Sequence, residues 1–303
     1  MAIDLQQIIN SPHTVRFVSV LARAVPPSVG YPVCDLIGKW AAARSGSTVT
    51  RAVRLNQWMA RGASLETKTL DDAVRETLQN NARDIYDLYH SLERPAETWR
   101  RICLNSLAEE LLGRPQFSNR GLVIVGIHMS SFDSAMLSLV QYGAKALVLT
   151  IPNPQGGRRM EFEMRQRIGM DILPASLDAL RQAIQYLEKG GLVVTGIDRP
   201  VAGLRLQPRF FGQPAPLPTH HILLASRARV PVVLMAVLRQ EDGKYTLLRS
   251  EPMEMEPSAN REQGILQNAE KVLHQAERFI RMAPQQWNMP LPVWPELMNR
   301  VPS

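Results

Sequence analysis

The sequence predicts an α/β fold in which a largely parallel central sheet is flanked by helices and preceded by a helical region. Four short, continuous apolar runs are typical of strands buried on both faces: residues 121–127, 145–151, 191–197 and 230–238. Stretches with helical periodicity separate these runs, and strand alternating with helix indicates a parallel sheet. No alternating strand signal occurs before residue 115, so we divide the chain into a helical region, 1–115, and an α/β core, 116–303.

Within the helical region the clearest helix is predicted over residues 64–92. Its apolar side chains recur at steps of three, four and seven, namely Leu70, Val74, Leu78, Ile85 and Leu88. A second helical pattern covers residues 95–115 and ends at a glycine and a proline.

Residues 15–40 form an apolar stretch that charged residues and the Pro26-Pro27 pair interrupt. A membrane-spanning helix needs about 20 apolar residues, so we do not expect this stretch to cross a bilayer. The chain also begins without the basic and apolar regions of a secretory signal. Two interpretations stay open: the stretch packs on its own domain, or it lies on a membrane surface. In the second case the inserted residues are Phe17, Val18, Val20 and Leu21, with Arg16 and Arg23 at the head groups.

In the α/β core, helices are expected between the strands, over residues 131–143, 157–170, 176–191 and 218–229. Residues 243–255 follow as a late antiparallel or edge strand. A final helix is expected over residues 260–283, before a proline-rich tail.

The composition limits the classes of function. A formal net charge of +7 favours anionic partners such as nucleic acid, anionic lipid or a phosphate-bearing cofactor. Nucleic acid is disfavoured, because the chain has no zinc-finger spacing, no aromatic and basic RNA signature and no dense lysine run. Cys34 and Cys103 lie far apart with no further ligand at metal spacing, which indicates a reduced, cytosolic chain without a zinc site or disulfide.

His128 and Asp133 are the first catalytic candidates. His128 follows the first predicted strand and Asp133 falls in the first turn of the next helix, and open α/β sheets bind ligands at such strand ends. A histidine can take a proton from a hydroxyl, and a nearby carboxylate stabilises the resulting imidazolium. This chemistry suits acyl transfer from a thioester to an alcohol. Spacing alone also allows a helix-capping box of Ser130 with Asp133, with His128 as a core residue.

Four blocks follow the H-x4-D motif of His128 and Asp133, over residues 165–174, 187–200, 209–233 and 276–295. With them the chain resembles the lysophospholipid acyltransferase superfamily, and within it the branch of lipid A late acyltransferases and phosphatidylinositol mannoside acyltransferases. The resemblance implies a glycerolipid acyltransferase-like core and transfer of a fatty acyl chain from acyl-CoA or acyl carrier protein to a membrane glycolipid. It implies no metal or redox cofactor. It also implies a peripheral protein at the cytoplasmic face of the bacterial inner membrane.

The same resemblance assigns roles to individual residues. His128 is the general base and Asp133 is its partner in the motif. Asp198 is a second carboxylate that orients His128 or the acceptor. Either Arg165 or Arg167 is the cation that meets the thioester carbonyl or an acidic head group.

Further contacts with substrate are expected at Arg158, Arg199, Phe211 and Gly212. Arg158 lies in a glycine- and arginine-containing stretch that suits the phosphates of coenzyme A or an acidic carrier protein. Phe211 and Gly212 are expected to form a wall or turn of a lipid cleft. The adjacent His220 and His221 are not expected to bind a metal, because they point to different sides of a helix and no third ligand is apparent.

Three departures from the related families bear on the acceptor. Acyltransferases of glycerol phosphate and lysophosphatidate usually carry a block similar to FPEGTR where this chain has TGIDRP, which favours a glycolipid acceptor. Lipid A enzymes typically begin with a membrane-spanning helix, which this sequence does not indicate. The related last block often has a basic residue after its tryptophan, where Asn288 follows Trp287 here. The alternative functions are a lysophospholipid or glycerolipid acyltransferase and a catalytically inactive lipid-binding protein.

Overall fold

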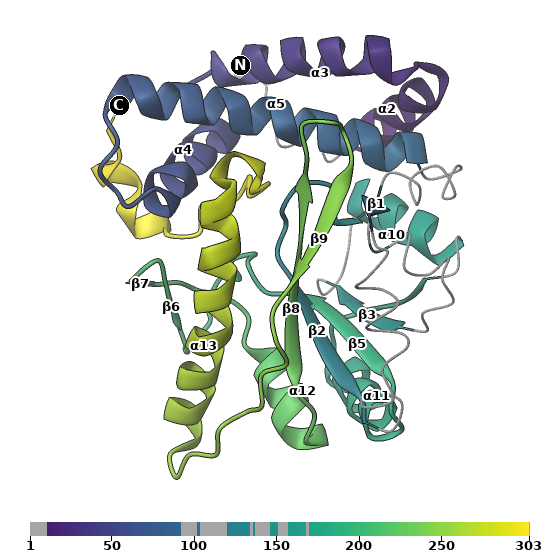
Figure 1. Ribbon diagram of the computed structural model, residues 1–303, viewed down its shortest axis with the longest axis vertical. Helices are drawn as coiled ribbons and strands as arrows, with labels where there is room; N and C mark the ends of the chain where they lie inside the picture. The colour runs from purple at the N-terminus through teal and green to yellow at the C-terminus, as the bar shows by residue number, and fades with distance from the viewer. Residues whose placement is uncertain are drawn as a thin grey trace.

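The computed structural model describes residues 11–91, 102–103, 120–133, 136, 146–150, 157–167 and 170–302. A central sheet is flanked by helices, and a layer of N-terminal helices lies across one end of that sheet (Figure 1). The boundary expected near residue 115 lies outside the described residues.

Seven strands of the described residues form one sheet in the order β1-β9-β8-β2-β5-β3-β4. Their bounds are β1 Ile102–Cys103, β2 Leu122–Gly126, β3 Ala146–Thr150, β4 Asp171–Pro174, β5 Leu192–Gly196, β8 Val232–Arg239 and β9 Tyr245–Arg249. Neighbouring strands are parallel except for β8 and β9, which are antiparallel. The predicted α/β fold with a largely parallel sheet is therefore confirmed. The predicted antiparallel strand is also confirmed, although β9 lies inside the sheet and not at its edge.

Two strands of the sheet were not predicted. β1 lies in residues 95–115, where a helix was expected. The other residues of that segment are outside the described residues. β4 is an edge strand whose first residue, Asp171, is exposed and whose last is a proline. β1 has two residues and β4 has four, so neither strand is long enough to show a continuous apolar run.

Helices account for most of the described residues outside this sheet. They are α2 Pro12–Ala24, α3 Pro27–Ala42, α4 Thr48–Ala60, α5 Thr67–Ser91, α10 Gly157–Arg167, α11 Leu177–Glu188, α12 His220–Ala228 and α13 Arg261–Met282. Two 3-10 helices, η1 Pro284–Gln286 and η2 Pro295–Arg300, and a hairpin of β6 Arg209–Phe210 with β7 Gln213–Pro214 complete them. Side chains of Ser47, Ser176 and Asn260 cap the N-termini of α4, α11 and α13.

The central strand β2 contributes to two hydrophobic clusters. All five of its residues are buried, and alternate residues of a strand face opposite sides of a sheet. Val123 and Val125 belong to a cluster that includes residues of α11, α12 and α13, whereas Leu122 and Ile124 belong to one that includes Tyr86 of α5. The long apolar run of residues 121–127 follows from this burial on both faces.

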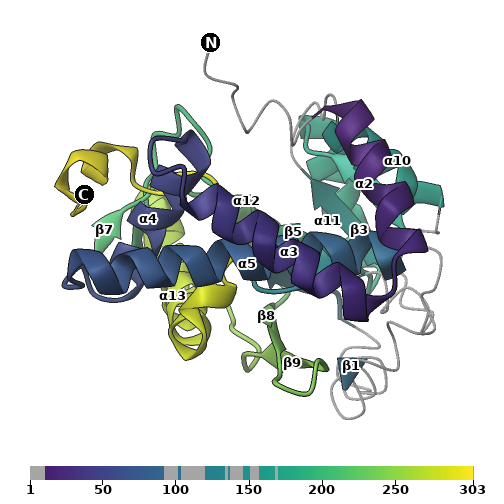
Figure 2. The same cartoon turned by 90° about the horizontal axis from the view of Figure 1, so that it is seen from above.

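The helix α5 lies across the end of the sheet at which the parallel strands terminate (Figures 1 and 2). Arg239, the last residue of β8, donates a hydrogen bond to Asn80 of α5 at 3.1 Å. The helix α3 also approaches α5 closely, at Gly30 and Gly38. A Cβ atom at these glycines would lie 2.5 Å from Tyr86 and Gln79, respectively. The helical region thereby covers the carboxyl ends of the parallel strands, where open α/β folds bind ligands. Ile85 of α5 was predicted on the apolar face but is 37% exposed.

The outward side of α2 and α3 remains apolar and exposed. Its large side chains are Phe17, Val20, Leu21, Val29, Val33, Leu36, Ile37 and Trp40. Val18, which was expected with them, is half-buried and packs against the core. Among the helices that the structure describes, none is both long and apolar enough to cross a membrane.

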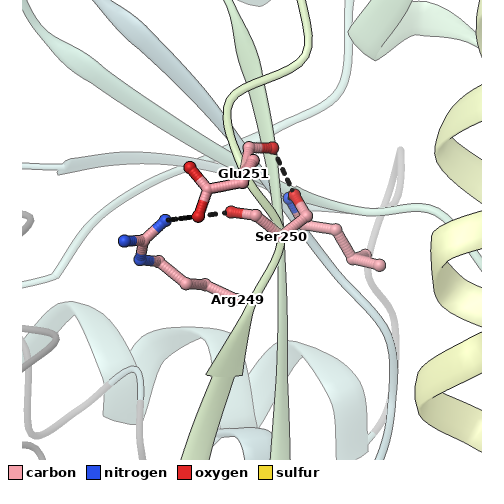
Figure 3. A network of polar contacts seen from close by, with 4 residues as sticks. Arg249, Ser250 and Glu251 are labelled. Carbon is pink, nitrogen blue, oxygen red and sulfur yellow. Dashed lines mark hydrogen bonds and ion pairs between the residues drawn. The ribbon is translucent and has the colours of Figure 1, made fainter.

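The Ser250 side chain, directly after β9, forms a hydrogen bond with β8. The Leu234 amide of β8 donates to the Ser250 hydroxyl at 2.9 Å, and that hydroxyl donates to the carbonyl of Glu251 at 2.9 Å. Arg249 donates to the Glu251 carboxylate at 3.4 Å, so three consecutive residues fold back on one another as Figure 3 shows. The two bonds of the buried Ser250 satisfy polar groups where the chain leaves the sheet.

Candidate active site

The candidate site lies at the carboxyl ends of the neighbouring strands β2 and β5. These strands pair in parallel, with Gly126 opposite Gly196. His128 lies two residues after Gly126, and Asp198 lies two residues after Gly196. The register of the two strands therefore places His128 and Asp198 side by side at the carboxyl ends of the strands. Gly196 allows the close approach of the histidine ring, because a Cβ atom there would lie 3.2 Å from His128 Cε1.

One carboxylate contacts both the ring and the main chain of His128. The distance between His128 Nδ1 and Asp198 Oδ1 is 2.6 Å, and the His128 amide donates to Asp198 Oδ2 at 2.8 Å. Trp287 Nε1 donates to the same Oδ2 atom at 2.9 Å. Asp198 is completely buried, while the His128 side chain is 22% exposed. The imidazole is therefore held firmly on one side and open to solvent on the other.

The electrostatics of Asp198 define the proton positions in this pair. Burial alone raises the pKa of the Asp198 carboxyl, but the charge and hydrogen bonds of His128 and the bond from Trp287 outweigh burial, so that the pKa lies below its ordinary value. An ionised carboxylate only accepts hydrogen bonds, so His128 Nδ1 must carry the shared proton. The other ring nitrogen, Nε2, is then the atom with a free lone pair in the neutral ring.

Asp133 takes a different partner from the one that its spacing suggested. Its Oδ2 lies 3.0 Å from a terminal nitrogen of Arg165 on α10. Against the effect of burial, the charges of Arg165, His128 and Arg199 hold the pKa of Asp133 below its ordinary value. The Asp133 side chain is 44% exposed. The carboxylate in contact with the imidazole is thus Asp198, whereas Asp133 forms an ion pair beside it.

A comparison with known families identifies the kind of protein to which the chain belongs. A family model described as bacterial lipid A biosynthesis acyltransferase matches residues 9–295. The chain belongs to this family. No curated protein sequence matches the chain. The protein is therefore an acyltransferase of lipid biosynthesis, and the family implies a bacterial, membrane-associated enzyme that acylates a glycolipid.

In this acyltransferase the C-terminal segment lies against the candidate site, a contact that the sequence did not predict. Met129 forms an antiparallel bridge with Trp287. The Ser130 amide donates to the Gln286 carbonyl at 2.7 Å, and the Asn288 amide donates to the His128 carbonyl at 2.7 Å. In the sequence, Trp287 stands out only as a member of the block at residues 276–295. Its role as a donor to Asp198 follows from a contact between residues 89 positions apart, which no local pattern reveals.

The other basic residues predicted for the acyltransferase site divide into two groups. Arg165 and Arg199 bring positive charge to Asp133. Arg167 is exposed on α10, two residues beyond Arg165. Arg158 lies on the same helix, but its side chain is outside the described residues. The structure therefore places Arg165, and not Arg167, in the ion pair next to His128.

Phe211 and Gly212 form the turn between β6 and β7. Both have positive φ, 48° and 76°, which is a conformation that favours glycine. The Phe211 ring centroid lies 6.1 Å from that of Trp287, and the Arg281 guanidinium lies 4.9 Å above the Phe211 ring. Gly212 is exposed. The turn therefore packs Phe211 against the tryptophan that contacts Asp198, while contact of either residue with lipid stays a prediction.

His220 and His221 sit at the start of α12 in a buried environment. His220 Nε2 lies 2.8 Å from the Thr195 hydroxyl. Burial lowers the pKa of His220 to about 4 and that of His221 to about 3, so both rings are neutral near pH 7. Among the residues that the structure describes, no group of three or more histidine, cysteine or acidic side chains is arranged to hold a metal ion.

Proposed function

We propose that this acyltransferase moves a fatty acyl chain from acyl-CoA or acyl carrier protein to a hydroxyl of a membrane glycolipid, with His128 as the general base. The contact of His128 Nδ1 with the buried Asp198 carboxylate supports this proposal above all. In the step we propose, Nε2 removes the proton of the acceptor hydroxyl, and the oxygen attacks the thioester carbonyl. The tetrahedral intermediate then expels the thiolate, which takes the proton back from the imidazolium. The products are an ester and a free thiol.

Asp198 supports the charged state of His128 in this mechanism. The carboxylate keeps the proton on Nδ1 and stabilises the imidazolium that forms when Nε2 accepts a proton. Trp287 and the His128 amide both donate to Asp198 Oδ2, so the carboxylate cannot turn away from the ring without losing hydrogen bonds. A neutral base, an ionised partner and a fixed ring are the requirements of general-base catalysis. The mechanism needs no metal or redox cofactor.

Arg165 is the cation that we assign to the developing oxyanion or to an acidic group of the substrate. Its side chain is 17% exposed and its ion pair with Asp133 fixes it next to His128. A cation held in this way stabilises negative charge without reorganisation at the moment of reaction. Asp133 then acts through Arg165, and its charge also favours the imidazolium from a greater distance than Asp198 does.

The acceptor that we propose is a glycolipid of the lipid A or phosphatidylinositol mannoside kind. The family match supports a glycolipid, and so does the TGIDRP block, in which Asp198 directly follows β5. A lysophospholipid acceptor remains the alternative to be tested. The inactive lipid-binding alternative is disfavoured, because the family consists of acyltransferases.

We propose that the exposed apolar side of α2 and α3 attaches the enzyme to the cytoplasmic face of the inner membrane. Asp35 is the acidic residue of these two helices, and it forms an ion pair with Arg83. Lys39 and Arg44 are exposed nearby, and the Arg44 guanidinium stacks on Trp40 at 3.2 Å. Apolar side chains with cations around them suit an anionic lipid surface. Because α2 packs against α10 (Figure 2), this surface lies close to the helix that carries Arg165.

The test is acyl transfer by purified enzyme, measured by mass spectrometry of the products. Donors are acyl-CoA and acyl carrier protein, and acceptors are glycolipids and lysophospholipids in separate reactions. We expect an acylated glycolipid, and we expect His128→Ala to lower its rate by about 10² to 10⁴. The matched control is His274→Ala, because this histidine is 69% exposed on α13. Acylation of lysophospholipids alone would select the alternative acceptor, and equal rates for His128→Ala and His274→Ala would exclude His128 as the base.

A further inference from the structure

Asp84 of α5 is a buried carboxylate that the proposed mechanism does not use. Only 7% of the residue is exposed. Asn288 Nδ2 donates to its Oδ2 atom at 2.5 Å, and the Ser130 hydroxyl donates to its Oδ1 atom at 3.4 Å. These two donors come from the loop after β2 and from the C-terminal segment. Asp84 therefore joins the N-terminal helical layer to two distant parts of the chain that meet at His128.

The loop held by Asp84 has an unusual backbone. Ser130 has a φ of 47°, in the left-handed region that non-glycine residues adopt at a cost. Residues held in this region need surrounding structure that fixes them. Besides its bond to Asp84, Asn288 Nδ2 donates to the Ser130 carbonyl at 3.2 Å, and the Asn288 amide donates to the His128 carbonyl at 2.7 Å. One asparagine thus holds the main chain on both sides of Met129.

We propose that Asp84 is a positioning residue for His128: through Asn288 and Ser130 it holds the loop that keeps the imidazole on Asp198. The inference rests on the proposed function for the catalytic role of His128, but the geometry that it describes is independent of any substrate. It also gives a physical role to the asparagine that follows Trp287, where related enzymes often have a basic residue. An amide at this position donates to the loop carbonyl and to the carboxylate at once.

The charges around Asp84 make this link sensitive to pH. Burial raises the pKa of Asp84 to about 7 and the charge of Asp87 on the same helix adds to this, whereas the bonds from Asn288 and Ser130 and the charge of Arg239 on β8 oppose it. The ionised carboxylate accepts from both donors. The neutral acid carries a proton on one oxygen and so has one acceptor position fewer. The link is therefore complete above neutral pH and weaker below it.

The proton on His128 Nδ1 reports the position of the ring without any substrate. A short hydrogen bond from this nitrogen to an ionised carboxylate gives a proton resonance far downfield in the NMR spectrum of the full-length enzyme. His128→Ala identifies the signal by its loss. At pH 8 we expect Asp84→Ala and Asn288→Ala each to broaden or shift it. Asp84→Asn, which keeps an acceptor oxygen, is expected to restore it. The matched control is Asp72→Asn, an exposed aspartate of α5, which is expected to leave the signal unchanged.

The kinetic arm separates positioning from a loss of fold. We expect Asp84→Ala to lower kcat by about tenfold to 10²-fold, the scale on which a misplacement of about 1 Å acts, with the KM of the acyl donor unchanged. The double variant Asp84→Ala with Asn288→Ala is expected to be no slower than the slower single variant.

The outcomes distinguish this inference from the proposed function. A Nδ1 resonance that responds to Asp84→Ala in an enzyme without acyl transfer would retain the positioning role and reject the function. An unchanged resonance in folded Asp84→Ala would overturn the positioning role, whatever the activity. Multiplying kinetic losses in the double variant would likewise overturn it, because the two residues would then act separately.

Discussion

Asp198 binds His128 twice, with Oδ1 2.6 Å from the ring nitrogen Nδ1 and Oδ2 2.8 Å from the main-chain amide. A single buried carboxylate therefore fixes the tautomer of the ring and the position of the residue that carries it. Trp287 completes the arrangement by donating to Oδ2. From this geometry we expect substitutions of Asp198 and of the residues around it to differ in their effects on activity and stability.

Asp198→Asn should lower kcat far more than its small change in volume suggests. An amide in place of the carboxylate has no charge to stabilise the imidazolium and can donate to Nδ1, which would move the ring proton to Nε2. We expect kcat to fall by about 10³ to 10⁴ at pH 7.5, as for the equivalent change in a histidine–aspartate pair of a protease. The control is Asp178→Asn, an aspartate with an 80% exposed side chain. Near-normal turnover of Asp198→Asn would show that this carboxylate does not orient the base.

Asp133→Asn should have a smaller effect of a different kind. The substitution removes the ion pair with Arg165 but leaves the bond between His128 and Asp198 in place. We therefore expect kcat/KM to fall by about ten- to a hundredfold, with part of the loss in KM for the acyl donor. Steady-state kinetics beside Asp198→Asn provide the comparison. If Asp133→Asn were the more damaging of the two, Asp133 would be the carboxylate that supports the base.

Trp287→Phe should make the enzyme less stable in a pH-dependent manner. The pKa of Asp198 is lowered in the folded state, so its ionised form stabilises the fold above its unfolded pKa of about 3.9, and this contribution is lost as the pH falls through the folded pKa. Loss of the indole donor removes a hydrogen bond to a charged group, at a cost of about 1.5 to 3 kcal/mol near neutral pH.

Trp294→Phe is the matched control for this stability measurement. Trp294 is also buried, and its Nε1 atom has no hydrogen-bond partner among the described residues. Both variants lose the same volume, so the difference between their free energies of unfolding isolates the bond to Asp198. We expect this difference to be largest near pH 7 and to shrink below about pH 4. A difference that does not change with pH would contradict an ionised Asp198 as the acceptor.

Asp84→Asn should change stability with pH in the opposite direction. Burial raises the pKa of Asp84 to about 7, so this group contributes stability that is fully present below its unfolded pKa of about 3.9 and is lost as the pH rises through the folded pKa. The variant lacks this titration. Its melting temperature relative to wild type should therefore rise by a few degrees between about pH 5 and pH 8. Thermal melts alongside Asp72→Asn check this, and parallel curves for the wild type and Asp84→Asn would contradict the raised pKa.

Leu36→Ser should weaken the attachment of the enzyme to vesicles that contain anionic lipid. Leu36 is 65% exposed on α3. Burial of a leucine side chain in an apolar environment contributes roughly 1.5 to 3 kcal/mol to the free energy of membrane binding. We therefore expect binding to weaken by at least about tenfold. Leu177→Ser is the control, because Leu177 is 76% exposed on α11. Co-sedimentation measures both. Equal weakening by the two substitutions would assign the interaction to exposed apolar area in general and not to the side formed by α2 and α3.

The location of the candidate site could be predicted from the sequence more completely than the contacts within it. His128 and Asp198 stood out because each follows an apolar run that became a buried strand, β2 or β5. Which carboxylate contacts the ring depends on the pairing of those strands, and β3 and β4 separate them along the chain. The local H-x4-D spacing suggested Asp133, which instead meets Arg165.

The sequence did not predict the residues that contact Asp198 and Asn288, namely Trp287 and Asp84. Trp287 and Asp84 reach the site from the C-terminal segment and from α5, and neither stretch has a local pattern that indicates a contact with Asp198 or Asn288. The hydrogen bond between Asp84 and Asn288 spans 204 positions. Burial of single polar side chains at such long-range contacts has no periodic signal. In contrast, the continuous apolar runs predicted the central strands, and the helical period of residues 64–92 predicted α5.

The most direct measurement compares the rate of acyl transfer by three variants under identical conditions: His128→Ala, Asp198→Ala and the double variant. It tests whether the two residues act as one catalytic unit. We expect each single variant to lose at least about 10² in kcat and the double variant to be no slower than His128→Ala, because an orienting carboxylate has no function without its base. Losses that multiply in the double variant, or wild-type turnover in His128→Ala, would contradict a base that is oriented by Asp198.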